Sequence, residues 1–120
     1  RRLRDALVEA AERGVEVRLL YDDMGCFTVR RGFYREMMKR GIEVRAFMRI
    51  FQIRPSWRLN FRNHRKIVVI DGQVGYIGGM NVADRYVDGD KDLSWRDTHM
   101  RVAGPAVHGL QMSFSIDWCY

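Results

Sequence analysis

A histidine and a lysine stand two positions apart at the start of the stretch NHRKIVVIDGQVGYIGGMN, residues 63–81. Side chains two positions apart on a strand share a face, so His64 and Lys66 are expected to face the same ligand while Arg65 points the other way. A neutral imidazole can attack phosphorus, and a lysine ammonium can neutralise charge on the phosphate oxygens. The pair therefore predicts phosphoryl-transfer chemistry that requires no metal or other cofactor.

The other end of the stretch carries two glycines and an asparagine, Gly78, Gly79 and Asn81. A glycine pair lets the backbone come close to a ligand, and an asparagine amide is a hydrogen-bond donor for phosphate oxygens. We therefore expect Gly78 and Gly79 to lie at the substrate-binding surface, and Asn81 to bind the phosphate together with Lys66.

A nucleophilic histidine also needs a carboxylate that fixes its tautomer. Asp97 begins a later strand and is the candidate partner of His64. Asp71 is a weaker candidate, because it lies at the far end of its strand from His64, where a turn or an ion pair suits it better. His99 shares the face of Asp97; a supporting role is open, but the pattern favours an ordinary hydrogen-bonded histidine of the sheet.

The elements that must position these residues follow from hydrophobic periodicity. Apolar residues at helical spacing predict a first helix that ends at Gly14, followed by a strand over residues 15–23. This pattern recurs, because ERGVEVRLL is echoed later in the chain by KRGIEVRAF. The helix between the two strands is expected to pack Met37 and Met38 into the core. A strand, helix, strand unit of this kind predicts a parallel pair with a right-handed crossover.

The later part of the chain contains a predicted hairpin, a further strand and a last helix. Asp71-Gly72 is a favoured tight-turn dipeptide, a strand in RDTHMRVAG follows, and Pro105 opens the helix. Residues 48–63 have no clean period and are expected to form a long exposed loop. Strands that alternate with helices predict a single α/β domain over residues 1–120, with a mixed β-sheet flanked by helices.

Charge is unevenly distributed along the chain. The formal net charge is +6, and between Val44 and Ile70 there is no acidic residue while seven basic residues alternate with aromatic ones. Such a balance indicates anionic partners, but it does not separate phosphate, nucleic acid and a membrane surface. Arg62, within this basic stretch, is expected to bind substrate. Whether the stretch as a whole contacts lipid headgroups or is only a solvated face is open.

The longest segment without acidic or basic residues, 102–116, is too short and too rich in glycine, serine and histidine to span a bilayer. Any membrane anchor is therefore expected outside this chain, which begins within a helix and without a methionine. The two cysteines, Cys26 and Cys119, lie far apart and outside a CxxC pattern. They suit a reducing compartment and argue against a cysteine zinc site, so the cytoplasmic side is expected.

The spacing of the motif resembles that of the HKD motif of the phospholipase D superfamily: His64-x-Lys66-x4-Asp71-x6-Gly78-Gly79-x-Asn81. With YDDMG upstream and WRDTHMRVAGPAV downstream, the chain is similar over nearly its whole length to the first HKD half of bacterial cardiolipin synthases. The resemblance implies a phospholipase D-like half-domain. Many superfamily members have Gly-Ser where this chain has Gly78-Gly79, so a hydroxyl that could assist the phosphate is absent.

In that family, a histidine attacks a phosphatidylglycerol phosphodiester, releases glycerol and holds a phosphatidyl-histidine intermediate. A second phosphatidylglycerol then displaces the histidine, and cardiolipin is formed. The resemblance implies that His64 is the nucleophile and that Lys66 and Asn81 bind the phosphate. It also implies that Asp97 orients the histidine and that Asp71 is a structural member of the motif. The implied substrate is phosphatidylglycerol or another anionic phospholipid at the cell membrane surface.

The superfamily builds each site from two HKD elements, one supplying the nucleophile and the other the general acid for the leaving alkoxide, and this chain has one. Alone it is expected to be half a site with little turnover. The second half either follows in the full protein or comes from a second copy in a homodimer. Two other functions are open: a phosphodiesterase acting on phospholipid or, less favoured, on nucleic acid, and a non-catalytic half that completes a partner's site.

Overall fold

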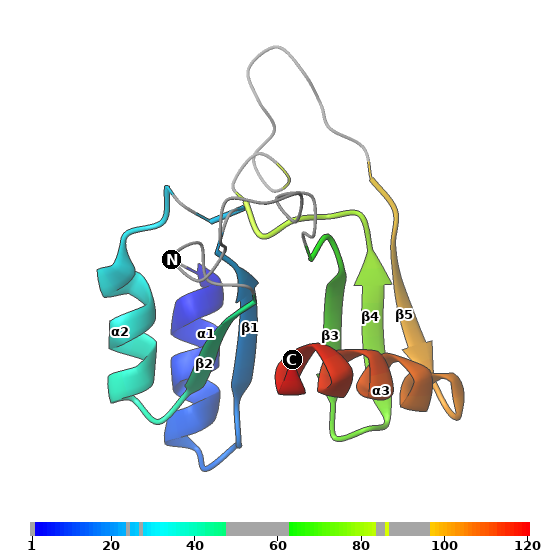
Figure 1. Ribbon diagram of the computed structural model, residues 1–120. Helices are drawn as coiled ribbons and strands as arrows, with labels where there is room; N and C mark the ends of the chain where they lie inside the picture. The colour runs from blue at the N-terminus through cyan, green and yellow to red at the C-terminus, as the bar shows by residue number, and fades with distance from the viewer. Residues whose placement is uncertain (1, 24, 27, 48–62, 84–85, 87–96) are drawn as a thin grey trace. The chain divides into compact units, whose positions relative to one another are not determined.

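The computed structural model describes residues 2–23, 25–26, 28–47, 63–83, 86 and 97–120. The chain divides into two compact units, Arg1–Asn63 and His64–Tyr120 (Figure 1). The first unit combines two helices with a small parallel sheet, and the second combines one helix with a small antiparallel sheet. The predicted α/β class is therefore confirmed. A single domain over the whole chain stays a prediction.

The first unit is a strand, helix, strand arrangement preceded by a helix. Its elements are α1 (Arg2–Glu12), β1 (Arg18–Asp22), α2 (Arg31–Lys39) and β2 (Glu43–Phe47). The two strands pair in parallel along their whole length, as predicted. The first strand is shorter than the predicted 15–23, because pairing begins only at Arg18 and Val15 is half exposed. Gly14 follows α1 with φ 89°, the left-handed conformation expected of a glycine after a helix.

A small hydrophobic core holds the first unit together. Its buried residues are Tyr34, Met37 and Ile42, with 8%, 0% and 2% exposure. The Tyr34 ring stacks on Tyr21 of β1 with ring centroids 3.9 Å apart, which joins α2 to the sheet. Burial is the main reason that the pKa of the Tyr34 hydroxyl is raised. Met38 is 49% exposed, so the prediction that both neighbouring methionines pack into the core is wrong for this one, which lies beyond the buried stripe of the helix.

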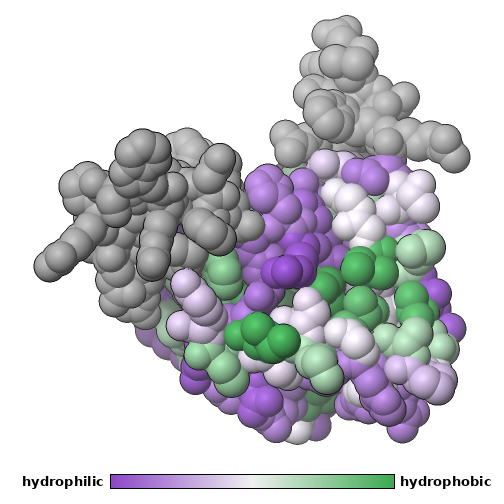
Figure 2. All heavy atoms as spheres, turned by 45° about the vertical axis from the view of Figure 1, so that its right-hand side comes forward, coloured by the Kyte–Doolittle hydropathy of each residue, from purple (hydrophilic) through white to green (hydrophobic). Residues whose placement is uncertain are grey.

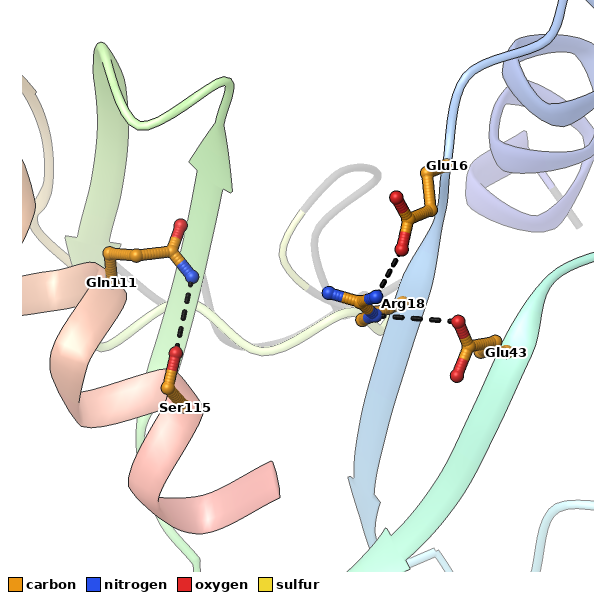
Figure 3. Close-up of polar contacts among 5 residues, drawn as sticks. All are labelled: Glu16, Arg18, Glu43, Gln111 and Ser115. Atoms are coloured by element: carbon orange, nitrogen blue, oxygen red, sulfur yellow. Dashed lines mark hydrogen bonds and ion pairs between the residues drawn. The ribbon is translucent and has the colours of Figure 1, made fainter. Parts of the chain in front are cut away.

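Charged side chains of the first unit pair across its surface. Arg18 on β1 contacts the carboxylates of Glu16 and of Glu43, its neighbour on β2, the latter at 3.4 Å (Figure 3). Arg40, after α2, pairs with Glu12 at the end of α1. These pairs connect neighbouring elements, although an exposed ion pair contributes at most about 1 kcal/mol to stability.

The second unit is an antiparallel sheet with a helix on one side. Its elements are β3 (Lys66–Ile70), β4 (Val74–Gly78), β5 (His99–Ala103) and α3 (Ala106–Cys119), and the strand order is β3-β4-β5. Asp71 and Gly72 join the first two strands with φ of 52° and 64°. The Gln73 amide donates to the Ile70 carbonyl at 3.0 Å. Two consecutive positive φ values characterise a type I′ hairpin turn, so the predicted tight turn is confirmed.

The sheet of the second unit has two different faces. A Cβ added to Gly75 would lie 2.6 Å from Leu110 Cδ1 of α3, so α3 packs on the side of Gly75 and of its cross-strand neighbours Val69 and Val102, the helix face. Residues of the opposite parity form the other side, here named the open face: Lys66, Val68, Ile70, Val74, Tyr76, Gly78, His99, Arg101 and Ala103.

Apolar side chains are also exposed on the outer side of α3. Val107 is fully buried, whereas Met112 and Ile116, one turn apart, are 66% and 62% exposed. On the face of the molecule that Figure 2 shows, apolar areas (green) lie among hydrophilic ones (purple). Within the described residues, no helix combines the length and the apolar character that crossing a bilayer requires.

Candidate active site

The beginning of β3 carries the histidine and the lysine of the motif. His64 is exposed, and Lys66 turns its Nζ back to the His64 backbone carbonyl, 2.6 Å away. The guanidinium of Arg65 goes to the other side, where its Nη1 lies 2.9 and 3.2 Å from the two carboxylate oxygens of Asp117 on α3. The predicted divergence of Arg65 from Lys66 is therefore confirmed: the arginine belongs to the helix face and the lysine to the open face.

Lys66 begins a row of three residues across the sheet. It lies opposite Gly78 of β4, and Gly78 in turn lies opposite His99 of β5. Residues that are directly opposite each other in an antiparallel sheet point to the same face. A lysine and a histidine therefore flank a glycine that places no side chain between them. The two ends of the motif meet at one edge of the sheet, as the sequence predicts.

Close packing at this edge explains why both positions of the pair are glycines. A Cβ on Gly79 would collide with both carboxylate oxygens of Asp97. A Cβ on Gly78 would collide with the Thr98 carbonyl and would lie 2.6 Å from the Cα and 2.7 Å from the Nδ1 of His99. The Gly79 amide also donates to the Thr98 carbonyl at 3.1 Å. We name this arrangement the glycine socket: Gly78 and Gly79 hold residues 97–99 against the end of β4.

Asp97 lies in the glycine socket, two residues before the start of β5. Its Oδ1 accepts a hydrogen bond from the Thr98 amide at 2.7 Å, and the carboxylate lies against Gly79. Among the described residues, no hydrogen bond joins Asp97 to His64. The structure therefore brings the carboxylate to the same edge of the sheet as the motif, and its contact with the nucleophile stays a prediction.

The other two polar members of the motif have partners of their own. Asn81 is exposed, and its amide Nδ2 donates to the Tyr86 hydroxyl at 3.3 Å. Asp71 lies in the hairpin turn at the opposite end of β3. At ~3.3 Å per residue, about 16 Å of strand separates it from Lys66. This location agrees with the prediction that Asp71 has a turn role rather than contact with the histidine.

His99, at the same edge, differs from what the sequence predicts. It was expected to be an ordinary hydrogen-bonded histidine, but among the described side chains its Nδ1 is buried without a hydrogen-bond partner. The parity of His99 with Asp97 was visible in the sequence. Its position opposite Gly78 was not, because that depends on the pairing of β4 with β5.

The basic stretch that precedes the motif is only partly covered by the structure. Arg62, predicted to bind substrate, and the loop predicted at 48–63 lie outside the described residues except for Asn63. Within the described part, the site is thus an edge of the second unit. It combines an exposed histidine, a lysine that donates a hydrogen bond to a backbone carbonyl, a carboxylate in the glycine socket and an asparagine amide. These groups can attack, neutralise and orient a phosphodiester.

A family model described as "Cardiolipin synthase, PLD-like domain" matches residues 1–118. The chain belongs to this family of phospholipase D-like domains. It is 48% identical over 120 residues to the "Major cardiolipin synthase ClsA" of Bacillus subtilis, and 47% identical over 119 residues to a "Cardiolipin synthase" of Staphylococcus aureus. These alignments cover 98% of this chain but 25% and 24% of the relatives, so the chain spans about a quarter of their length.

Proposed function

We propose that this chain is one half of a phosphatidyltransferase site that joins two phosphatidylglycerols into cardiolipin and glycerol. The observation that supports the proposal best is the meeting of Lys66 and Gly78 at the edge of the sheet beside His64, in a chain of the cardiolipin synthase family. The names of the relatives favour this acceptor chemistry over hydrolysis of nucleic acid.

In the proposed reaction, His64 attacks the phosphorus of one phosphatidylglycerol. An N–P bond forms while the P–O bond to the terminal glycerol breaks, and a general acid from a second HKD half protonates the leaving alkoxide. The hydroxyl of a second phosphatidylglycerol then attacks the same phosphorus and gives its proton to that group. The N–P bond breaks, cardiolipin leaves, and both histidines return to their starting state.

Lys66 has the hydrogen-bonding capacity to neutralise the phosphate. An ammonium has three donors, and one of them is used on the His64 carbonyl. Among the described residues Lys66 has no carboxylate partner, so its charge is available to the oxygens of an anionic ligand. The same hydrogen bond fixes the backbone of the nucleophile relative to the cation. Asn81 would release Tyr86 and add a neutral donor.

Asp97 is proposed to orient the imidazole of His64 through its second ring nitrogen. Support comes from its place in the glycine socket, where packing against Gly79 and a hydrogen bond from Thr98 limit its freedom. A carboxylate fixed in this way selects the tautomer that leaves the attacking nitrogen unprotonated.

The second half of the site is proposed to lie in the same polypeptide or in a second copy of the chain. The relatives are about four times as long as the aligned segment, which leaves room in them for another such half. The proposed partner is a membrane surface that presents phosphatidylglycerol or another anionic phospholipid on the cytoplasmic side. A net charge of +6 suits that surface.

Replacing the nucleophile in the full-length parent tests the proposal. With vesicles of phosphatidylglycerol as substrate, His64→Ala is expected to abolish cardiolipin formation and to remove any acid-labile phosphatidyl adduct on the enzyme, because no other group takes over the N–P bond. His108→Ala is the matched control, since His108 is an exposed histidine of α3 in the same unit. Cardiolipin synthesis at the wild-type rate by His64→Ala would refute the assignment.

A further inference from the structure

His99 lies where a third group could reach a phosphate bound by Lys66. Lys66, Gly78 and His99 are aligned across three strands on the open face. Neighbouring strands are about 4.8 Å apart, so roughly 10 Å separates the backbones of the lysine and the histidine. A lysine and an imidazole that face each other over this span can both contact one phosphate group above Gly78. The glycine provides a floor without a side chain.

The environment of the ring determines which nitrogen can donate. Nδ1 faces Gly78 and is buried without a hydrogen-bond partner among the described residues. A proton on Nδ1 would be a buried N–H without an acceptor, which proteins avoid more strictly than an unused lone pair. The neutral ring therefore carries its proton on Nε2, the nitrogen across Cε1 from Nδ1, which is not among the buried unpartnered atoms of the described residues. His99 as a whole is only half-buried and its Nδ1 is buried, so Nε2 is the ring nitrogen that a ligand can approach.

We propose that His99 is a further phosphate-binding residue of this site, and that its Nε2–H donates to a non-bridging oxygen of the phosphodiester held by Lys66. The inference rests on the proposed function. The division of labour follows from charge: Lys66 compensates the single negative charge of a phosphodiester, and His99 adds a neutral donor on the opposite side. The His99 ring packs directly against Gly78, since a Cβ added there would lie 2.7 Å from Nδ1.

Three substitutions of His99 in the full-length parent separate a donor at Nε2 from other roles. His99→Gln places an amide N–H close to the position of Nε2, His99→Asn places one close to Nδ1, and His99→Phe retains a ring without nitrogen. With phosphatidylglycerol vesicles as substrate, we expect kcat/KM of the glutamine variant to stay within about threefold of wild type. The other two variants should lose about 10- to 100-fold, the range for a hydrogen bond to a charged group. Competitive inhibition by inorganic phosphate should weaken in the same order.

The outcomes divide cleanly. Rescue by glutamine alone, with melting temperatures equal to wild type, supports the proposal. Full activity of His99→Phe, equal losses in all three variants, or better activity with asparagine than with glutamine would overturn it. If the phenylalanine variant melts at a lower temperature, the glutamine and asparagine variants, which differ by one methylene, decide the question. Loss of activity in His64→Ala together with wild-type behaviour of His99→Phe would refute this inference alone, whereas full activity in His64→Ala would refute the proposed function.

Discussion

The unit of residues 1–63 and the unit of residues 64–120 use their side chains in different ways. Among the described residues, the first unit buries Tyr34, Met37 and Ile42, whereas the second unit buries one large apolar side chain to a similar degree, that of Val107. In the second unit α3 covers one face of the sheet, and the other face carries Lys66 and the half-exposed Val68. The strand residues proposed to bind phosphate therefore lie on the open face, which no described helix of the same unit covers.

Charged residues differ in the same way. In the first unit Arg18 and Arg40 are neutralised by glutamates of neighbouring elements. In the second unit Arg65 pairs with Asp117, but Lys66, one residue later, donates to a carbonyl that has no net charge. A cation that is fixed without being neutralised is suited to an anionic ligand. On the proposed function, the first unit contributes to stability and the second to chemistry, and the following experiments test that separation.

Among the experiments that compare the two units, substitution in the glycine socket has the largest expected effect. Gly79→Ala should reduce cardiolipin formation by the full-length parent by about 100-fold or more, because a Cβ would displace the Asp97 carboxylate, and misplacing a catalytic group by about 1 Å costs that much. Gly79→Ser should lose as much, since its Cβ meets the same oxygens. The measurement is kcat/KM with phosphatidylglycerol vesicles.

Gly109→Ala is the matched control for the glycine socket. Gly109 lies within α3, and an added Cβ has nothing within 4 Å. Alanine in a helix interior is more favourable than glycine by about 0.5–1 kcal/mol, so this variant should be slightly more stable and equally active. Wild-type activity of Gly79→Ala would show that the position of Asp97 does not matter for the reaction.

The core of the first unit should affect stability without affecting chemistry. Met37→Ala removes a side chain with 0% exposure and is expected to lower the free energy of unfolding by about 2–5 kcal/mol. The neighbouring Met38 is 49% exposed, and Met38→Ala should change stability by less than about 0.5 kcal/mol. Denaturant titration measures both, and kcat/KM per folded molecule should be unchanged. A loss of kcat/KM in folded Met37→Ala would contradict the separation of the two units.

The parts of the fold that were predictable are those governed by local chemistry. The Asp71-Gly72 dipeptide predicts a type I′ turn, because both positions need positive φ. The repeated strand pattern predicts the parallel pair. Strand length and the fate of Met38 were mispredicted, since both depend on what packs alongside. Periodicity identifies an apolar face of a helix but not where its exposed edge begins.

The site was predictable as a set of residue types but not as an arrangement. Motif spacing identified His64, Lys66 and Asn81 as candidates. Alternation along the strand predicted that Lys66 and Arg65 point to opposite faces of the sheet. The contacts of Gly78 and Gly79 with residues 97–99 could not be predicted, because Gly78 lies opposite His99 only through the register of β4 with β5. That register depends on the course of the chain between Gly79 and Asp97, for which the sequence contains no periodic signal.

The ion pair between Arg65 and Asp117 provides the smallest expected effect and sharpens the comparison of charges. Its side chains are 56% and 13% exposed, while those of the Arg40–Glu12 pair in the first unit are 60% and 51% exposed. Water screens the exposed pair more, so double-mutant cycles with alanine should give coupling free energies of about 0.5–1 kcal/mol for Arg65–Asp117 and below about 0.5 kcal/mol for Arg40–Glu12. Denaturant titration provides the four stabilities of each cycle. Equal couplings would mean that the partial burial of Asp117 does not strengthen the link between α3 and the motif. A larger coupling for Arg40–Glu12 would reverse the comparison, because the first unit would then depend on its charges more than the unit that carries the site.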